Sequence, residues 1–380
     1  MYLLDGAFDF YVTATDIAGN RSVSSTTTTI TIDQTAPDVS SVVIDLDDGS
    51  DTGFKNNDNL TNDTSPTFTV SSLVPTDSVY IYFNGADSNK LKADATTESF
   101  TGNLTTDGDY IATIKSRDIA GNLSSISTGL NFRLDTTPFT PATNPNLLAE
   151  FDSGMSSSDD TTSSRVPQFE VTQLPSISDS LYLYIQSGIT NQLVQKTIKG
   201  YNKTKDTLFV PDGNDLGSGE FTVTYTVLDS AGNVSVPSNP MTLYIDYTAP
   251  NNPGEPILNS SSDQGESNSD RLTNQDRVNI TLTNILPGYS GLIYIDDGVT
   301  KTKIDSGFFT PGQEGITFDV PTAQTGTYTY TTVHIDTAGN RSGFSDPIII
   351  SVDRDAPSAA LTYEDDALVR SGDISTLVTF

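Results

Sequence analysis

Four stretches of similar sequence recur along the chain and decide its fold. The stretch "TDIAGNRSVSSTTTTITIDQTAP" runs from Thr15 to Pro37, and "IDTAGNRSGFSDPIIISVDRDAP" runs from Ile335 to Pro357. Two relatives between them begin with "RDIAGNLSS" at Arg117 and with "LDSAGNVSV" at Leu228. Self-similarity of this kind is the signature of a tandem repeat, so the repeat has to be placed before any other feature is interpreted.

Each stretch is bounded by two aspartates at a constant separation. We call the aspartate of D-x-A-G-N the turn aspartate and the aspartate before the final proline the closing aspartate; they are 17 residues apart in every copy. The turn aspartates are Asp16, Asp118, Asp229 and Asp336, and the closing aspartates are Asp33, Asp135, Asp246 and Asp353. Successive turn aspartates lie 102, 111 and 107 residues apart, so insertions fall only outside a fixed structural block.

Apolar residues alternate before the turn aspartates. Phe221, Val223, Tyr225 and Val227 show this pattern, and period-two alternation predicts a half-buried strand. The stretch after A-G-N is rich in Thr, Ile and Val, and A-G-N itself is a short glycine-containing loop. Each block therefore predicts a hairpin formed by the last two strands of a β domain, with a final strand of about 10 residues.

The segments upstream of each block predict the rest of the domain. Runs such as "SPTFTV", "DSVYIYF" and "ESFTGNL" add short strands without helical periodicity. This pattern predicts an all-β fold of tandem Ig-like antiparallel β-sandwich domains in an elongated array, without the Cys-Trp-Cys core of antibody domains. A glycine and an aromatic residue two positions later, as in Gly108 and Tyr110, agree with the corner such folds form before the penultimate strand. The expected domains are 37–137, 138–248 and 249–355, preceded by the C-terminal part of a truncated domain, 1–36, and followed by the start of another, 356–380.

The composition limits the classes of function. The chain has 49 Asp and Glu residues against 19 Lys and Arg residues, a formal net charge of −30. This charge repels phosphate backbones, so nucleic acid is not expected, and it favours cations as partners, although an acidic surface can also serve solubility alone. The absence of cysteine excludes disulfides, thiolate metal sites and cysteine nucleophiles. No apolar run is long enough for membrane insertion. Because the chain begins within a repeat and without a signal peptide, we expect it to be a fragment.

Three further acidic stretches share the form D-x-G-x-x-x-x-D and follow the presumed first strand of each complete domain, before the second. They are "DTGFKNND" from Asp51 to Asp58, "DSGMSSSD" from Asp152 to Asp159 and "DQGESNSD" from Asp263 to Asp270. Two carboxylates on a glycine-containing loop suit Ca²⁺, which takes about 6–8 hard oxygen ligands and tolerates irregular geometry, better than Mg²⁺, which demands an octahedron. A plain solvated loop is the alternative.

The acidic loop and the closing aspartate are expected at the C-terminal end of each domain, where the D-x-A-G-N loop of the next domain arrives. Clustered carboxylates repel one another without a cation, so composite Ca²⁺ sites are predicted at the junctions. The predicted sets are Asp33 with Asp118; Asp51, Asp58 and Asp135 with Asp229 and Asn233; Asp152, Asp159 and Asp246 with Asp336 and Asn340; and Asp263 and Asp270 with Asp353. Two alternatives stay open: the turn aspartate can cap its own turn, and the closing aspartate can merely end a strand.

Three features together resemble a known family: the D-x-A-G-N hairpin, the "IDQTAP" type of junction and the loop "SDTGFKNNDNLTNDTSPTF". They are similar to tandem bacterial Ig-like repeats of large repetitive secreted surface adhesins, of the biofilm-associated, type I-secreted kind, and the resemblance covers essentially the whole chain. It implies a rod of sandwiches, often calcium-dependent at the junctions and exported to the bacterial cell surface. We therefore expect an extracellular structural extension (stalk) segment. Its expected partners are neighbouring Ig-like domains, and host or surface glycans reached through a distal module.

Other functions have weaker support in the sequence. The single histidine, His334, has no Ser or Cys nucleophile motif beside it, and carboxylate pairs recur in every repeat, which enzymes rarely do with an active site. No enzyme activity is therefore expected. A carbohydrate-binding adhesive module remains an alternative, because the runs "YIYF" (Tyr80–Phe83) and "YLYI" (Tyr182–Ile185) could present tyrosines to sugars. Accessory Ig-like modules of a secreted polysaccharide hydrolase are the other alternative.

Overall fold

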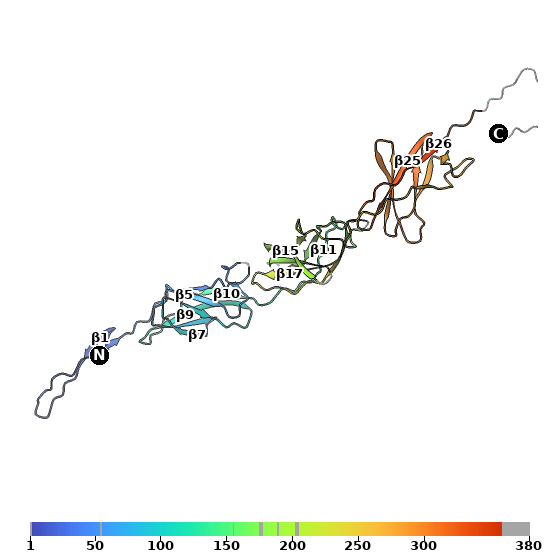
Figure 1. Cartoon of the computed structure of the whole chain (residues 1–380). Coiled ribbons are helices and arrows are strands. Elements are labelled where there is room, and N and C mark those ends of the chain that lie inside the picture. Colours follow the sequence, from blue (N-terminus) through green and yellow to red (C-terminus); the bar gives the residue numbers. More distant parts are fainter. Residues whose placement is uncertain are drawn as a thin grey trace, which may run out of the picture. The chain divides into compact units, whose positions relative to one another are not determined.

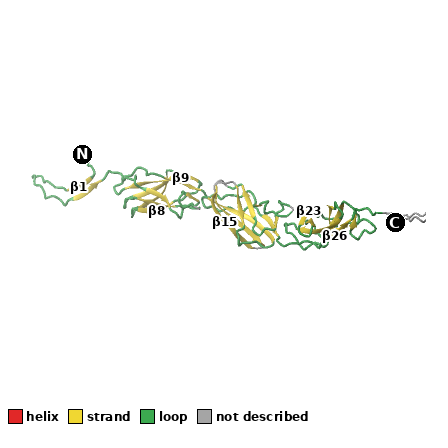
Figure 2. Ribbon diagram, turned by 90° about the horizontal axis from the view of Figure 1, so that it is seen from above, coloured by secondary structure: helices red, strands yellow, loops and turns green. Residues whose placement is uncertain are grey.

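Two sheets, one of three strands and one of five, form each complete domain in a computed structural model of the chain (Figure 1). The structure describes residues 2–358 except 54, 155, 175–177, 188–189 and 202–204. Strands and loops make up all of this described part (Figure 2), where no helix has the length and apolar character needed to cross a membrane. The chain divides into two units, Met1–Tyr247 and Thr248–Phe380, each of which is described by itself.

The first unit begins with a two-stranded hairpin, followed by the first complete domain. The hairpin pairs β1 (Gly6–Phe10) with β2 (Thr28–Ile32). In the first complete domain the sheet orders are β3-β5-β8 and β4-β10-β9-β6-β7. The strands are β3 (Val43–Leu46), β4 (Leu60–Thr61), β5 (Thr67–Ser71), β6 (Ser78–Phe83), β7 (Ala86–Lys92), β8 (Thr97–Thr101), β9 (Gly108–Arg117) and β10 (Leu130–Leu134).

The next two domains repeat this topology. In the second complete domain the orders are β11-β13-β16 and β12-β18-β17-β14-β15, and in the third they are β19-β21-β24 and β20-β26-β25-β22-β23. The second contains β11 (Asn146–Leu147), β12 (Thr161–Thr162), β13 (Gln168–Thr172), β14 (Ser178–Ser187), β15 (Thr190–Tyr201), β16 (Lys205–Phe209), β17 (Gly219–Asp229) and β18 (Met241–Ile245). The third contains β19 (Ile257–Leu258), β20 (Leu272–Thr273), β21 (Arg277–Leu282), β22 (Ser290–Asp296), β23 (Lys301–Phe308), β24 (Ile316–Pro321), β25 (Gly326–Ile335) and β26 (Ile348–Val352).

The first strand of each domain is divided between the two sheets, which we did not expect from the sequence. In the first complete domain β3 pairs antiparallel with β5, whereas β4 pairs in parallel with the last strand, β10. The acidic loop connects β3 to β4, so it lies within the divided first strand and not between the first and second strands. Because Leu60 and Thr61 pair with Arg133 and Leu134 at the end of β10, the loop is held at the C-terminal end of its domain.

Each complete domain has its own hydrophobic core between its two sheets. Alternation along the strands supplies it: in β5 the side chains of Phe68 and Val70 are fully buried, while their neighbours are half-buried. Burial of a large apolar side chain contributes about 1.5–3 kcal/mol, so each domain is stabilised by its own residues. The all-β fold of tandem Ig-like sandwiches that the sequence predicts is confirmed.

The predicted hairpin of the last two strands is present, but its second arm differs from the expectation. The final strand β10 has five residues instead of about 10. Between the turn and β10, the hydroxyl oxygen of Ser124 accepts the backbone N–H of Ser116, and that of Ser127 accepts the N–H of Ile114. The same bonds are made by Ser22, Ser25, Ser235, Ser238, Ser342 and Ser345 in the other copies. An S-x-x-S pair therefore replaces part of the strand ladder.

The corner before the penultimate strand is also present. The hydroxyl of Tyr110 donates to the main-chain oxygen of Thr106 at 2.6 Å, and that of Tyr328 donates to the main-chain oxygen of Gln324 at 3.0 Å. These are the bonds of a tyrosine corner. The second complete domain has Phe221 at this position, which cannot donate such a bond.

Candidate metal site and domain junction

The turn aspartates are hydrogen-bonded within their own turns. Oδ1 of Asp229 accepts the backbone N–H groups of Ala231 at 3.1 Å and Asn233 at 2.8 Å, and Oδ2 accepts the side-chain N–H of Asn233 at 3.0 Å. Bonds from the equivalent asparagine, Asn20, Asn122 or Asn340, reach Asp16, Asp118 and Asp336. The asparagine side chains lower the pKa of Asp16 and Asp118. The capping role left open by the sequence is thus present in all four copies.

Within the first unit, the asparagines that end two of the A-G-N turns also reach the preceding domain. Nδ2 of Asn233 donates to the main-chain oxygen of the closing aspartate Asp135 at 2.8 Å, and Nδ2 of Asn122 donates to that of Asp33 at 3.1 Å. The same amide groups are bonded to their turn aspartates. The turn aspartate therefore positions the asparagine that joins two domains.

The acidic loop of the first complete domain contacts the same turn of the second. The hydroxyl of Thr52 donates to the main-chain oxygen of Ala231 at 2.5 Å and accepts the backbone N–H of Asn62 at 2.8 Å. Gly53 has a φ of 97°, and a Cβ added to it would lie 2.1 Å from the main-chain oxygen of Ser230. Because only glycine combines this backbone conformation with so close an approach, Gly53 is a structural requirement of this junction.

One carboxylate of each acidic loop is buried. We call Asp51, Asp152 and Asp263 the first loop aspartates, and their exposed fractions are 3 %, 5 % and 3 %. Oδ2 of each accepts the backbone N–H of the residue eight positions later, at 3.0, 3.4 and 3.1 Å respectively. Oδ1 of each is buried and has no hydrogen-bond partner among the described residues. An unpartnered buried carboxylate oxygen is costly, so its repetition in three domains makes this oxygen the candidate ligand atom of each loop.

The second carboxylate of each loop adds negative charge beside the first. Burial raises the pKa of Asp51 and Asp152, and the charges of Asp58 and Asp159 raise it further. We call Asp58, Asp159 and Asp270 the second loop aspartates; they are exposed, and each accepts a backbone N–H from two residues later at 3.1–3.3 Å. A divalent cation between the two carboxylates would remove the repulsion that raises the pKa.

The structure brings together only part of each predicted set. Within the described residues, no group of three or more His, Cys, Asp or Glu side chains is placed to hold a metal ion. The closing aspartates Asp33, Asp135 and Asp353 each accept the backbone N–H two residues later, at 3.0, 3.1 and 2.9 Å. Asp246 and Asp336 fall in different units. The two aspartates of each acidic loop fit a hard cation best, because the turn aspartates already accept several hydrogen bonds; metal binding by any of these residues stays a prediction.

We expect the substitution Asp229→Ala to loosen the contact between the first two complete domains. It removes the bonds that cap the turn and orient Asn233, and it should lower the stability of the second domain by about 1–3 kcal/mol. The chain has no cysteine, so spin labels at Ser99→Cys and Thr207→Cys, on exposed positions of β8 and β16, can report the distance between the domains by pulsed electron resonance. The distance distribution should broaden.

Asp16→Ala is the matched control for this substitution, because Asp16 caps the same kind of turn near the N-terminus. It should leave the label distances unchanged. An unchanged distribution in the Asp229 variant would show that the turn does not restrain the junction in solution.

The single histidine is packed inside the third complete domain. His334 is 4 % exposed, and its ring lies edge-on to that of Tyr289. Burial lowers its pKa, although a hydrogen bond with the backbone of Asn251 opposes this. Its burial therefore favours the neutral imidazole, and the side chain serves as a packed core residue.

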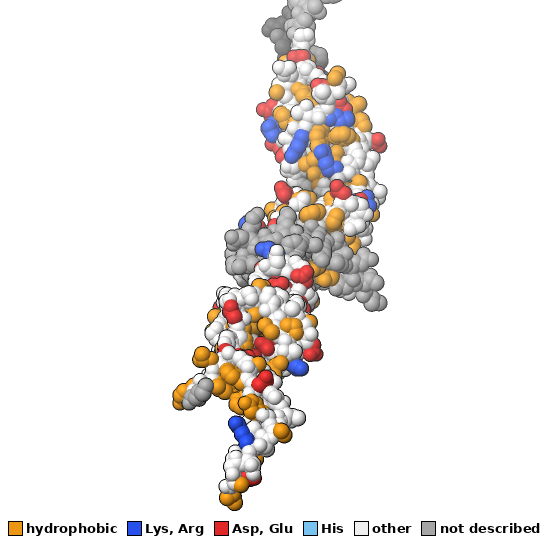
Figure 3. Space-filling model, turned by 90° about the vertical axis from the view of Figure 1, so that its left-hand side faces the viewer, with side chains coloured by type: hydrophobic (Ala, Val, Ile, Leu, Met, Phe, Trp, Pro, Cys, Tyr) orange, Lys and Arg blue, Asp and Glu red, His pale blue; other side chains and the backbone are white. Residues whose placement is uncertain are grey.

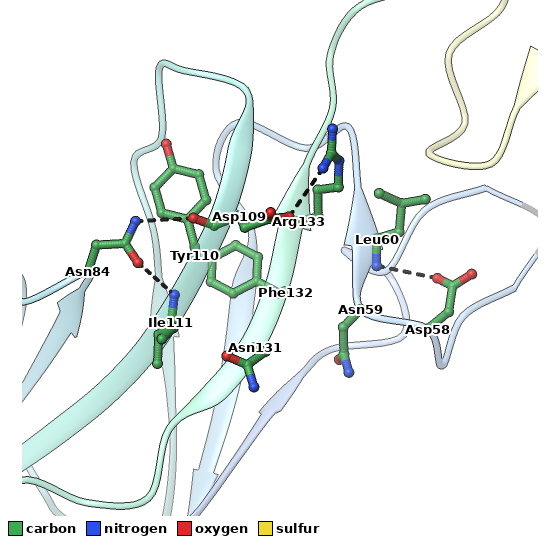
Figure 4. A pocket seen from close by; sticks show the side chains of 10 residues that line it. All are labelled: Asp58, Asn59, Leu60, Asn84, Asp109, Tyr110, Ile111, Asn131, Phe132 and Arg133. Carbon is green, nitrogen blue, oxygen red and sulfur yellow. Dashed lines mark hydrogen bonds and ion pairs between the residues drawn. The ribbon is translucent and has the colours of Figure 1, made fainter.

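An open hollow of about 650 Å³ lies on the first complete domain, beside the second loop aspartate Asp58 (Figure 4). The side-chain oxygen of Asn84 accepts the N–H of Ile111 at 2.8 Å, and its amide donates to the main-chain oxygen of Asp109 at 3.2 Å. Asp109 in turn pairs with Arg133 at 3.3 Å. Because these polar groups are satisfied by the protein, the hollow does not define a separate ligand.

Comparison with known sequences decides the family. A family model described as bacterial Ig-like domain matches residues 38–136 and 139–247, more than half of the chain. The chain belongs to the bacterial Ig-like domain family. The two matched bacterial Ig-like domains are those joined through Asn233 and Gly53. No curated protein matches the sequence.

Several solved structures show a limited likeness to this bacterial Ig-like chain. The FN1–FN3 domains of chicken CNTN1 are 12 % identical over 77 % of this chain and 95 % of that one, with a TM-score of 0.36. A Ca²⁺-stabilized adhesin of an Antarctic bacterium is 18 % identical, covering 91 % of this chain and 82 % of that one, with a TM-score of 0.34. A 1.5-MDa bacterial ice-binding adhesin is 16 % identical, covering 82 % and 96 %, with a TM-score of 0.32. Likeness at this level assigns no function.

Proposed function

We propose that this chain is an extracellular extension segment of a large bacterial cell-surface adhesin, and that Ca²⁺ bound by its acidic loops stiffens the junctions between its domains. The observation that carries the proposal is the buried first loop aspartate, which recurs in all three complete domains with one unpartnered oxygen. Tandem bacterial Ig-like domains in a chain with a net charge of −30 are consistent with a mechanical role outside the cell.

The position of the loop links metal binding to the junction. Thr52 and Gly53 follow the first loop aspartate Asp51 directly and contact the turn of the next domain. Holding Asp51 and Asp58 together would fix the backbone between them and therefore this contact. Bound Ca²⁺ would supply the positive charge that the two carboxylates lack.

Stiff junctions would increase the distance that the chain spans from the cell surface. The span of a flexible string of domains grows roughly as the square root of its length, whereas that of a rod grows linearly. Extracellular calcium modules commonly bind with Kd values of about 10⁻⁴–10⁻³ M. Such sites would be filled outside the cell and empty inside it, so the chain would remain slack during export.

Calorimetry and small-angle scattering of the whole chain test this proposal. Titration with Ca²⁺ should release or absorb heat with one site for each of the three acidic loops, and Mg²⁺ should bind more weakly. The maximum dimension should be larger in Ca²⁺ than in a chelator. Absence of heat together with an unchanged maximum dimension would reject calcium stiffening.

A further inference from the structure

The outer face of the five-stranded sheet in the first complete domain carries a cluster of basic and aromatic side chains. Tyr80 and Tyr82 of β6 lie on this face, since the residues that alternate with them are buried in the core. The strand register places Tyr80 between Lys90 of β7 and Lys115 of β9. Two residues earlier in β6, Ser78 lies between Lys92 of β7 and Arg117 of β9. We call the set Tyr80, Tyr82, Lys90, Lys92, Lys115 and Arg117 the basic patch.

The basic patch gathers most of the positive charge of its domain. Residues 37–137 contain six Lys and Arg residues against fifteen Asp and Glu residues, and four of the six cations belong to the patch. On the face of the molecule drawn in Figure 3, acidic and basic side chains are both scattered. None of the four cations forms an ion pair with a side chain that the structure describes. Their charge is therefore available to an external anion.

The cations converge on the tyrosines. Nζ of Lys90 lies 5.0 Å from the ring centroid of Tyr80, and Nζ of Lys115 lies 5.8 Å from that of Tyr82. Lys90, followed by Arg117, holds the pKa of the Tyr80 hydroxyl below its usual range. A phenol with cations on both sides is a setting in which a carboxylate or sulfate group finds several donors at once.

Protection of the sheet edge does not explain the patch. Lysines on an edge strand discourage pairing with other chains, and this suffices for Lys90 and Lys92, because β7 is the outermost strand. It does not suffice for Lys115 and Arg117, because β6 pairs with their part of β9 on one side and the segment of Ser124 and Ser127 is hydrogen-bonded to it on the other. Edge protection therefore does not explain why these two positions carry cations.

The second complete domain keeps a tyrosine pair on the same face but lacks the flanking cations of the neighbouring strand. Tyr182 of β14 is paired with Thr226 of β17, and Ser180 is paired with Leu228. Threonine and leucine therefore stand where the first domain has Lys115 and Arg117.

The third complete domain covers the same face with its own side chains. Leu292, Tyr294 and Val333 form a small separate hydrophobic cluster there. Arg341 donates to the hydroxyl of Tyr294 at 2.5 Å, and the ring of Phe344 packs edge-on against that tyrosine at 5.2 Å between centroids. A tyrosine paired with a lysine on each of its two neighbouring strands is thus a property of the first domain and not of the fold.

We propose that the basic patch binds an acidic polysaccharide. Its carboxylate or sulfate groups would pair with Lys90, Lys115 and Arg117, and its sugar rings would pack against the tyrosines. A flat sheet face suits an extended polymer, and Tyr80 and Tyr82 lie about 7 Å apart along one strand. A second copy of this chain is disfavoured as the partner, because its net charge of −30 repels the same charge here.

Binding of a polysaccharide to the basic patch goes beyond the proposed extension function. It requires neither bound Ca²⁺ nor that the parent protein be an adhesin. Binding along the side of the chain would attach it to an anionic matrix, in addition to any module at a distal end.

Binding of the whole chain to three immobilised polymers, measured in a chelator by biolayer interferometry, tests the proposal. We expect dextran sulfate to bind, neutral dextran not to bind and poly-L-glutamate to bind roughly tenfold more weakly or worse, since it has no sugar rings to pack on the tyrosines. No binding of dextran sulfate would overturn the proposal. Equal binding of poly-L-glutamate would overturn it in favour of an acidic polypeptide partner.

Paired variants locate the site. Lys115→Ala with Arg117→Ala should weaken dextran sulfate binding by about tenfold or more, because two charge-assisted contacts are lost. Lys205→Ala with Arg277→Ala is the matched control: it removes the same charge from two exposed cations that are paired with Glu170 and Asp319. The control should change binding by no more than about twofold. Equal losses of affinity in both variants would mean that the polymer responds only to the net charge of the chain and that the basic patch is not its binding site.

Discussion

Asparagine in place of the three first loop aspartates (Asp51→Asn, Asp152→Asn and Asp263→Asn) is expected to stabilise the chain in a chelator and to abolish its stabilisation by Ca²⁺. Asparagine has nearly the same shape, can still accept the backbone N–H eight residues later, and offers an amide N–H to the second loop aspartate. Each buried carboxylate oxygen without a partner costs about 1–3 kcal/mol, so each domain should gain on that order in the chelator.

Thermal unfolding in a chelator and in millimolar Ca²⁺ measures both effects. The parent chain should become more stable as the Ca²⁺ concentration rises above Kd, because the ion binds the folded state preferentially. The control is a triple variant at exposed aspartates, one per domain: Asp45→Asn, Asp212→Asn and Asp305→Asn. It should respond to Ca²⁺ like the parent. A full Ca²⁺ response in the first loop variant would remove these carboxylates from the set of ligands.

In a chelator, the stability that the first loop variant gains over the parent chain should shrink as the pH falls. Burial raises the pKa of Asp51 and Asp152, so the folded parent binds protons more tightly than the unfolded chain and gains stability as the pH falls through the raised pKa. The variant lacks these groups and gains nothing from them. Asp118, whose pKa is lowered, loses its contribution on acidification in both proteins equally, so it cancels in the comparison. A difference that stays constant from pH 7 to the onset of acid unfolding would contradict this.

The fold could be read from the sequence because its signals are local. Alternation in Phe221, Val223 and Tyr225 indicates a strand whatever the partner, and all three side chains are buried. The division of the first strand could not be read, since β4 has two residues and its pairing partner in β10 lies some seventy residues away. The S-x-x-S spacing is also a local signal, but it does not indicate a strand, because serine does not alternate with apolar residues there.

The acidic loops were visible as motifs, but the different roles of their two aspartates were not. Both ends of D-x-G-x-x-x-x-D carry the same side chain, yet Asp51 is buried and Asp58 is exposed. The difference arises when β4 pairs with the end of β10 and draws the backbone at Asn59 onto Asp51, a contact between distant parts of the chain. For the same reason, the bond from Asn233 to the main chain of Asp135 spans 98 residues and leaves no mark in the local pattern. The local pattern therefore suggests Asn233 only as a member of a metal site, whereas the structure shows it donating a hydrogen bond to the preceding domain.

Gly53→Ala is expected to separate the first two complete domains at their junction, with or without Ca²⁺. The added methyl group would lie 2.1 Å from the main-chain oxygen of Ser230, and neither backbone can yield without giving up the bond from Thr52 to Ala231. The left-handed backbone at this position adds a cost of about 1–2 kcal/mol for any residue with a Cβ.

Gly265→Ala separates these two causes. Gly265 occupies the equivalent loop position in the third complete domain, with a φ of 133° and no atom within 4 Å of an added Cβ. The substitution Gly265→Ala should therefore cause the same kind of backbone strain as Gly53→Ala, and it should lower only the stability of the third domain. Spin labels at Ser99→Cys and Thr207→Cys should show a broadened distance distribution in the Gly53 variant and the parental distribution in the Gly265 variant. If the Gly53 variant kept the parental distances, the acidic loop and the following turn would not touch in solution, and Ca²⁺ in that loop could not stiffen the chain through them.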